Sequence, residues 1–310
     1  MPLHFKQVFR KQSEKMIFSK DVYKVGVKTP QLFARKETGI RFQKDWGMYY
    51  TALYANTSDI GDLPPVSPWH GITCQPFKGE NVFNYINEIP LGSREKLEVN
   101  TKEEHNPIRQ DIKKVKEAKQ VPKNQGALID LENGGLGYLR KFTYGDIPFN
   151  YGCIPRTWEN PDVVDTMMEK GSGLKGDGDP IDVVELSRSS IPIGSVSQVR
   201  VLGVLGLVDE GEADWKILAC DYNDPTIKRL SDVSPARVKQ IVEWFTNYKT
   251  TDGKPKNEFA FGAGVQDEAF AMHVLENGSD HYKQLKLKAS KGAKTPYWIP
   301  TMESSANVPN

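Results

Sequence analysis

Residues 181–220, IDVVELSRSSIPIGSVSQVRVLGVLGLVDEGEADWKILAC, decide the fold of this chain. They contain three runs rich in β-branched residues, Ile181–Leu186, Val196–Val208 and Trp215–Cys220, which Gly, Pro and acidic residues separate. Apolar runs bounded by turn formers predict strands. We therefore expect these three runs to be core strands of one domain.

Further strands are expected upstream of this stretch. Val82–Ile89 is apolar and aromatic, and Lys96–Val99 alternates in polarity. Ile129–Leu131 and Tyr138–Phe142 flank an Asn-Gly-Gly sequence at 133–135, which is typical of a hairpin turn.

Helices are expected only after these strands. Ala236–Tyr248 follows Ser234-Pro235, which suits an N-cap with Pro at the first helical position, and a second helix is expected over Ala269–Leu285. Residues 55–68 are rich in turn formers and predict a loop. Because strands come early and helices late, the order favours an α+β domain, mainly β, built on an antiparallel barrel, over an alternating βαβ sheet.

The composition is that of a soluble globular protein. The chain has 310 residues, of which 38% are hydrophobic and 26% charged, and it contains no apolar run long enough to cross a bilayer. Cys74, Cys153 and Cys220 are scattered without CxxC spacing, so neither a disulfide framework nor a zinc cluster is indicated. We expect no membrane contact and a reducing compartment.

Charge is distributed unevenly along the chain. Residues 1–44 hold eleven Lys and Arg against three acidic residues, a balance of +8, so residues 45–310 carry −7 of the total of +1. The basic segment resembles an organelle transit helix; a solvated tail and a phosphate-binding arm are the alternatives. We expect a basic N-terminal extension over 1–44, the main domain over 45–285 and a polar C-terminal tail over 286–310. A mitochondrion or another organelle interior is favoured over the cytoplasm.

The densest chemistry lies at residues 176–182, GDGDPID. Asp177, Asp179 and Asp182 repel one another there, and carboxylate oxygens are the ligands that hard divalent metals prefer. The alternative is a solvated acidic turn. An EF-hand is excluded because its sixth and twelfth positions would not be Gly and Glu. A second acidic group, Asp209–Asp214, lies between two apolar runs and is placed to face the first.

Lysine, arginine and tyrosine residues accompany these acids, although each alone is more often an ordinary surface or packed residue. Many carboxylates with a few such donors are what metal-assisted phosphoryl transfer requires, because metal ions and cations together neutralise phosphate charge. No Ser-His-Asp or Cys-His set is evident from the sequence. The accompanying donors are Lys96, Arg140, Tyr151, Lys216, Tyr248 and Lys249, and two further acids, Glu88 and Glu98, lie on or between the expected strands.

Residues 177–182 resemble the Asp-x-Asp-Pro-x-Asp signature of the soluble family I inorganic pyrophosphatases of eukaryotic type, and further segments follow that family's order from Asn84 to Leu285. These segments are Glu88-Ile-Pro, Lys96-Leu-Glu98, Asn106-Pro-Ile with Gln110-Asp111, Asn150-Tyr151-Gly152, Pro155–Glu159, Asp209–Glu212 with Asp214–Lys216, Asn223–Pro225 and Asp252–Pro255. The resemblance implies a highly twisted, five-stranded OB-like antiparallel barrel with flanking helices. It also implies Mg²⁺-dependent hydrolysis of pyrophosphate to two orthophosphates by in-line attack of a metal-activated water.

The resemblance implies roles for single residues as well. Asp179 is expected to be the base for the attacking water, in a site that holds several Mg²⁺ ions. The metal ligands implied are Asp177, Asp182, Asp209, Asp214 and Glu98, and the outer acidic shell is Glu88 and Glu212. The substrate-binding residues implied are Lys96, Arg140, Tyr151, Lys216, Tyr248 and Lys249.

Three features depart from the family pattern. Leu91-Gly92-Ser93 stands where many relatives have Arg-Trp-Thr or Arg-Trp-Ser, and Ile147 stands where some have a Tyr. The spacing between Arg140 and Tyr151 also differs among relatives, which makes Arg140 the least secure of the expected phosphate ligands.

Two other classes stay open at this point. A phosphatase of larger phosphate esters would need an apolar or base-stacking pocket for the rest of its substrate. A nucleic-acid binder of OB type would need an exposed basic and aromatic face, which the charge of −7 over residues 45–310 disfavours. We therefore expect pyrophosphate and phosphate as ligands, no nucleic acid, and a homo-oligomer that is a dimer.

Overall fold

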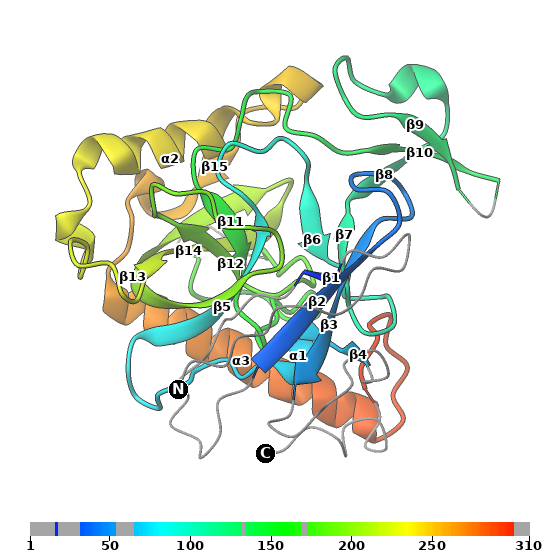
Figure 1. Ribbon diagram of the computed structural model, residues 1–310. Coiled ribbons are helices and arrows are strands. Elements are labelled where there is room, and N and C mark those ends of the chain that lie inside the picture. Colours follow the sequence, from blue (N-terminus) through cyan, green and yellow to red (C-terminus); the bar gives the residue numbers. More distant parts are fainter. Residues whose placement is uncertain (1–15, 18–31, 54–64, 132–133, 169–172, 301–310) are drawn as a thin grey trace.

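Five strands close into a ring at the centre of the molecule (Figure 1). The computed structural model describes residues 16–17, 32–53, 65–131, 134–168 and 173–300. Around the ring the strands follow the order β14-β12-β11-β5-β13, and β13 pairs back with β14. Their bounds are β5 Val82–Ile89, β11 Asn150–Cys153, β12 Asp182–Glu185, β13 Val196–Asp209 and β14 Glu212–Asp221. The expected five-stranded, mainly-β architecture is confirmed.

One pair of the ring is parallel, whereas the sequence predicts an antiparallel barrel. β12 and β14 run in the same direction, with Asp182 opposite Lys216, and the other four pairs are antiparallel. The reason is geometric: strand direction cannot alternate all the way round a closed ring with an odd number of strands. The two strands that meet in parallel are the ones that carry much of the chemistry below.

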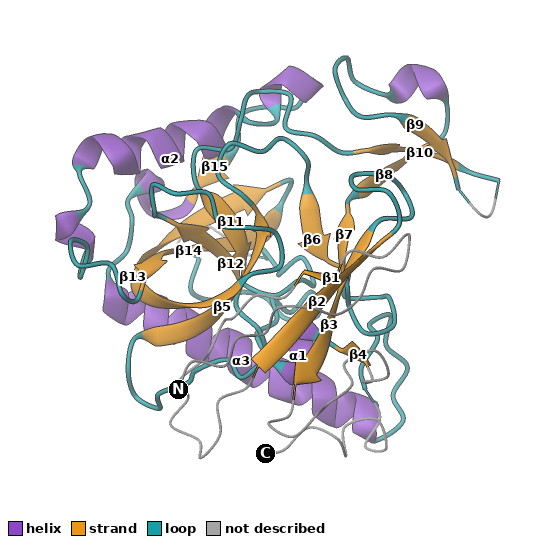
Figure 2. Cartoon of the chain, in the orientation of Figure 1, coloured by secondary structure: helices purple, strands orange, loops and turns teal. Residues whose placement is uncertain are grey.

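Alternation along the strands gives the ring two apolar faces. Leu218 and Val184 pack in the cluster that fills its interior, whereas Ile217 and Val183 belong to a second cluster on the outside. Helix α3, Glu268–Ser290, covers that outer face with Ala271, Val274 and Leu275 (Figure 2). Its N-cap is Asp267, whose side chain accepts a hydrogen bond from Phe270 N.

The expected helices are both present. Helix α2 spans Pro235–Asn247, with Ser234 as its N-cap and Pro at its first position. Helix α3 begins at Glu268, one residue before the expected start. It runs past the expected end at residue 285 to Ser290, into the predicted C-terminal tail. In the part of the chain that the structure describes, no helix has the length and apolarity to cross a bilayer.

A second sheet packs beside the ring and includes part of the basic N-terminal segment. Its order is β1-β2-β3-β7-β6, and β4 pairs with β3. The bounds are β1 Met16–Ile17, β2 Leu32–Thr38, β3 Gly47–Leu53, β4 Pro65–Val66, β6 Leu97–Val99 and β7 Ile108–Gln110. The expected domain boundary at residue 44 falls inside the turn of the β2–β3 hairpin. Residues 32–44 are therefore continuous with the sheet.

The β2–β3 hairpin is fastened to the loop that leads into β13. Arg35 Nη1 donates to Ile193 O at 2.6 Å, and Tyr50 Oη donates to Gly194 O at 2.9 Å. Of the expected loop over 55–68, residues 55–64 lie outside the described residues, and part of the remainder is regular structure rather than loop. β4 and the short helix α1, Pro68–Gly71, follow them.

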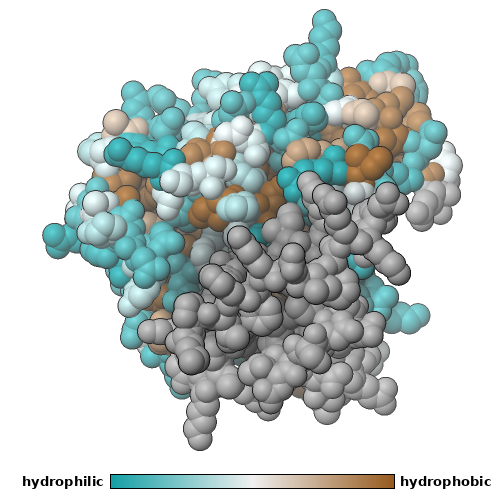
Figure 3. Space-filling model, viewed as in Figure 1, coloured by the Kyte–Doolittle hydropathy of each residue, from teal (hydrophilic) through white to brown (hydrophobic). Residues whose placement is uncertain are grey.

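A third, smaller sheet projects at the upper right of Figure 1. Its order is β8-β10-β9, with bounds Ile112–Val115, Leu136–Leu139 and Leu128–Asp130. The expected hairpin over this region is confirmed as the β9–β10 pair, although residues 132–133 of its turn lie outside the described residues. Figure 3 shows apolar surface gathered over this sheet, where Leu128 is exposed.

Short elements complete the chain. The single-turn 3₁₀ helices are η1 Ala118–Gln120, η2 Leu230–Asp232, η3 Thr250–Asp252 and η4 Ala260–Ala263, and β15, Glu258–Phe259, pairs with β13.

Candidate active site

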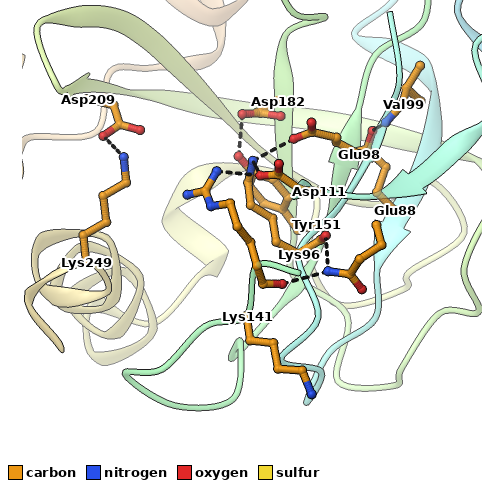
Figure 4. Close-up of polar contacts among 12 residues, drawn as sticks. Glu88, Lys96, Glu98, Val99, Asp111, Lys141, Tyr151, Asp182, Asp209 and Lys249 are labelled. Atoms are coloured by element: carbon orange, nitrogen blue, oxygen red, sulfur yellow. Dashed lines mark hydrogen bonds and ion pairs between the residues drawn. The ribbon is translucent and has the colours of Figure 1, made fainter. Parts of the chain in front are cut away.

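The parallel pairing of β12 with β14 brings opposite charges together at one end of the ring. Lys216 lies opposite Asp182, and its Nζ is 2.6 Å from Asp182 Oδ2 while it also contacts Asp214. Tyr151 Oη donates to the same Asp182 oxygen (Figure 4). Lys216 is only 2% exposed, so its charge is neutralised by these two carboxylates rather than by solvent.

The acidic turn over 176–182 is held against β14. Gly176 forms a parallel bridge with Ala213, next to Asp214. Asp179 N donates to Asp177 Oδ1 at 2.8 Å, and Trp158 Nε1 donates to Gly178 O at 3.0 Å. Gly178 has φ of 92°, a left-handed conformation that favours glycine. These contacts place the Asp177 side chain beside that of Asp214.

Three carboxylates form a cluster that fits a cation. Glu159, Asp177 and Asp214 each offer one oxygen, and these oxygens lie within 4.8 Å of one another. Glu159 Oε1 accepts from Trp215 N at 2.8 Å, whereas its buried Oε2 has no hydrogen-bond partner among the described residues. Glu159 and Asp214 are buried, whereas Asp177 is exposed. Desolvation, and then the neighbouring carboxylates, raise the pKa of all three groups well above the ordinary value. A bound divalent cation would relieve this repulsion.

Asp179 stands apart from that cluster. It is partly exposed, and its Oδ1 accepts a hydrogen bond from Thr101 Oγ1 at 3.3 Å. Burial and the nearby charge of Glu98 raise the pKa of Asp179 to about 8. A carboxyl group of this kind takes up a proton readily near neutral pH, which is what a general base must do.

A second group of charges joins two strands of the neighbouring sheet to β10. Lys96 Nζ lies 2.7 Å from Glu98 Oε2 and 2.9 Å from Asp111 Oδ2, and Arg140 Nη1 lies 2.5 Å from the same Asp111 oxygen. Burial lowers the pKa of Lys96 and Arg140, but the nearby carboxylates of Asp111 and Glu98 more than offset it, so both pKa values are raised. The two side chains therefore stay cationic.

A third group lies at the end of helix α2. Lys249 contacts Asp209, its Nζ is 3.2 Å from Glu210 Oε1, and Tyr248 Oη donates to Asp209 Oδ2 at 3.4 Å. Burial raises the pKa of the Tyr248 hydroxyl, so it stays protonated as a hydrogen-bond donor. Figure 4 shows the Lys249–Asp209 pair across from the group around Lys96.

The expected outer acids differ in their surroundings. Glu88 is buried in β5, its Oε1 accepts from Val99 N at 2.6 Å, and burial and Asp182 raise its pKa. Glu212 is exposed at the first position of β14, and partial burial and Asp209 raise its pKa.

The structure thus gathers most of the predicted side chains into three groups and leaves Asp179, Glu88 and Glu212 outside them. It also adds two residues that the sequence reasoning did not assign. Glu159 and Asp111 each occur in a segment quoted for the family resemblance, which is the one signal that pointed to them. Neither is spaced regularly from its partners in the chain. Their roles follow from tertiary contacts with Asp177 and with Arg140.

The departures from the family pattern cluster in space. Gly92 N donates to Ile147 O at 2.9 Å, and Ile147 N donates to Ser93 O at 3.0 Å. Ile147 is buried in the core. Arg140, despite its variable spacing, lies with Lys96 and Asp111.

A closed β ring that carries an acidic cluster beside a buried lysine, with two further groups of cations, is typical of one class of protein: an enzyme for metal-assisted chemistry on a phosphate compound. The family model described as inorganic pyrophosphatase matches residues 85–283. Human inorganic pyrophosphatase is 37% identical over 234 residues, covering 73% of this chain and 72% of its own. The Candida glabrata inorganic pyrophosphatase is 37% identical over 240 residues, covering 75% and 76%.

Solved structures show the same likeness. A recombinant inorganic pyrophosphatase from T brucei brucei has a TM-score of 0.71 and 32% identity, over 85% of this chain and 73% of its own. A Trypanosoma cruzi vacuolar soluble pyrophosphatase with its N-terminal domain truncated, in complex with PPi, has a TM-score of 0.68 and 30% identity, over 92% and 100%. The chain belongs to the inorganic pyrophosphatase family, which consists of metal-dependent hydrolases.

Proposed function

We propose that this chain hydrolyses inorganic pyrophosphate to two orthophosphates with Mg²⁺ ions in its site. The observation that carries the proposal is the carboxylate cluster of Glu159, Asp177 and Asp214 next to the buried Lys216. Two further groups of cations, Lys96 with Arg140 and Lys249, suit a compact ligand with negative charge at both ends.

Mg²⁺ is the proposed metal because the donor set consists of hard carboxylate oxygens. Asp177, Asp182, Asp209, Asp214 and Glu98 are the proposed ligands, with Glu159 added from the geometry. Mg²⁺ ions bound there would neutralise phosphate charge and acidify a bound water. Asp179 would accept the proton of that water, since its oxygen is partly exposed and hydrogen-bonded to Thr101.

Six side chains are proposed to hold phosphate oxygens. Lys216 is paired with Asp182 and Asp214, the carboxylates proposed to bind metal, so it occupies the place of a counter-ion. A metal ion held by those carboxylates would neutralise their charge, and the Lys216 ammonium would then be available to bind a phosphate oxygen. The other five side chains are proposed to donate to phosphate oxygens of the substrate. They are Lys96, Arg140, Tyr151, Tyr248 and Lys249.

Phosphate release from pyrophosphate, with and without Mg²⁺, tests this function. We expect turnover with Mg²⁺, little turnover with Ca²⁺, whose coordination is larger and looser, and none in EDTA. Release from ATP or ADP under the same conditions should be far slower. Full activity in EDTA, or equal rates with a nucleotide, would contradict the proposal.

We also propose a homodimer in an organelle, most simply the mitochondrion. The basic sequence over residues 1–44 supports the organelle, and a presequence within residues 1–31 would include the two-residue β1 but leave β2 in place. Light scattering after size exclusion tests the dimer. A fluorescent fusion of the full chain tests the compartment, and a wholly cytosolic signal would refute it.

A further inference from the structure

We propose that Gln125 is a positioning residue that couples two of the cation groups, a role that rests on the proposed function. Gln125 lies between η1 and β9, in the segment that builds the third sheet. Its Nε2 donates to Lys141 O at 3.0 Å and to each carboxylate oxygen of Asp252 at 3.0 Å. Its Oε1 accepts from Lys141 N at 2.7 Å. One side-chain amide thus bridges two segments that are far apart in sequence.

The contact with Lys141 fixes the backbone next to Arg140. Arg140 N donates to Asp111 O at 2.9 Å, and Arg140 O accepts from Gln110 Nε2 at 2.8 Å. The amide of Gln110 therefore holds residue 140, and the amide of Gln125 holds residue 141. The Arg140 guanidinium extends from a backbone that is held at two successive residues.

The contact with Asp252 fixes the turn that follows Lys249. Asp252 N donates to Lys249 O at 3.0 Å within η3, and the Asp252 carboxylate also accepts from Thr143 Oγ1 at 2.6 Å. Hydrogen bonds to a carboxylate are stronger than those between neutral groups. Gln125 and Thr143 together hold the turn from which the Lys249 side chain extends.

The three segments meet outside the acidic cluster. Gln125, Thr143 and Asp252 are partly buried, and their contacts given above involve neither the proposed metal ligands nor Asp179. We call Gln125 with Asp252 and Lys141 the amide clamp. The clamp reaches the substrate only through Arg140 and Lys249. Cations that hold the ends of a ligand bind the ground state and the transition state alike, so loss of the clamp should raise KM and leave kcat nearly unchanged.

Steady-state hydrolysis of pyrophosphate with saturating Mg²⁺ tests the clamp. Gln125→Ala should raise KM about tenfold, as expected for loss of hydrogen-bonded positioning, with kcat within about twofold of wild type. The matched control is Gln120→Ala, at a glutamine in η1 of the same segment. Gln120 Oε1 accepts from Lys116 N and Glu117 N, so this substitution should leave KM unchanged. An unchanged KM in Gln125→Ala, or a loss confined to kcat, would overturn the proposal.

Exchanging the amide and the carboxylate between positions 125 and 252 distinguishes a positioning role of Gln125 from a general effect on folding. Gln125→Glu keeps the shape but places a carboxylate against Asp252, so its KM should rise at least as much as that of Gln125→Ala. Adding Asp252→Asn supplies a donor again and should lower that KM at least threefold, which a general loss of stability would not do. Absence of this rescue in a folded double variant would count against the clamp.

Binding of Mg²⁺-imidodiphosphate, a pyrophosphate analogue, measured by calorimetry, tests the clamp independently of the proposed hydrolysis. Gln125→Ala should weaken this binding about tenfold. If the wild type failed to hydrolyse pyrophosphate, the proposed function would fall, and this binding comparison would still decide on the clamp. Equal affinity in wild type and Gln125→Ala would overturn the clamp alone.

Discussion

Asp179 and Asp182 are three residues apart, on either side of Pro180, yet their contacts predict different roles. Both are partly exposed, but Asp182 is paired with Lys216 and Tyr151, whereas Asp179 is hydrogen-bonded to Thr101. Asp179→Asn should lower kcat by about 10²–10⁴, the usual contribution of a general base, and keep most of the Mg²⁺ affinity. Asp182→Asn should instead weaken Mg²⁺ binding. Kinetics and calorimetry on both variants check this, and equal loss of Mg²⁺ binding would place Asp179 among the ligands.

Lys216 gives a second prediction at the same scale. Lys216→Met should lower kcat/KM at least about 100-fold, because a charge-assisted contact to phosphate is lost in a water-poor site. Since the ammonium neutralises Asp182 and Asp214, its removal should leave Mg²⁺ affinity equal or higher. Titration calorimetry beside kinetics measures both. Lys283→Met, at an exposed lysine of helix α3, is the control and should change neither; unaltered kinetics in Lys216→Met would remove it from the site.

Single residues also show where sequence reasoning reached its limit. The acids Asp177, Asp179 and Asp182 are five residues apart at most, so their density is visible along the chain. Glu159 joins Asp177 through tertiary backbone contacts, since Glu159 N donates to Asp179 O and Gly178 N donates to Glu159 O, both at 2.9 Å. No local periodicity encodes that contact.

At the scale of elements, Gly152 allows β11 to lie close to β5. A Cβ added at Gly152 would lie 1.9 Å from Ile86 O, at the register shift between the two strands. Gly152→Ala should therefore destabilise the protein by about 3 kcal/mol, since backbone rather than a flexible side chain must move. Urea unfolding measures this. Gly145→Ala, where a Cβ meets nothing within 4 Å, is the control, and equal stability of the two variants would contradict the argument.

The helices α1 and α3 meet at a buried histidine. His70 Nδ1 lies 2.8 Å from Tyr282 Oη and Nε2 lies 3.1 Å from Trp298 O. Burial lowers the pKa of His70 to about 3. The unfolded chain binds a proton below its ordinary pKa of about 6.5 while the folded protein does not, so stability is lost as pH falls from about 6.5 towards 3.

This linkage predicts a measurable pH dependence. Between pH 7 and pH 5, His70 should cost about 2 kcal/mol of unfolding free energy. His70→Gln cannot titrate, so the difference in stability between the two pH values should shrink by about that amount, whatever the other groups contribute. Urea titrations at both pH values check it. An unchanged difference would mean that His70 is not the group responsible.

The elements that sequence reasoning recovered are the ones with a clear apolar pattern. β5, β13, β14 and both long helices carry their hydrophobic period in consecutive residues. β2 was missed because its charged residues place it in the basic segment, and Arg35 becomes buried only through its bond to Ile193. The parallel pair β12–β14 depends on ring closure, which no single strand encodes.

For the whole molecule, the structure predicts where the N-terminal segment becomes indispensable. Deletion of residues 1–31 leaves β2 and should retain activity. Deletion of residues 1–44 removes β2, with the buried Phe33 and Arg35, and should cost at least about 3 kcal/mol and lower Tm by about 6 °C or more. Calorimetric melting and pyrophosphate hydrolysis of both truncated chains measure this. Equal Tm values would show that the β2–β3 hairpin adds no stability.

The buried Lys216 also has a consequence for folding. In the observed alignment of β14 with β12, Lys216 meets Asp182, while Trp215 and Ile217 on either side of it face helix α3. A slip of one residue would turn the lysine towards that helix and leave an ammonium without a counter-charge among apolar side chains. An unpaired buried charge costs several kcal/mol, so the misaligned sheet is less stable than the observed one by about that amount. The charge that we propose for phosphate binding therefore also favours the correct alignment of β14 with β12.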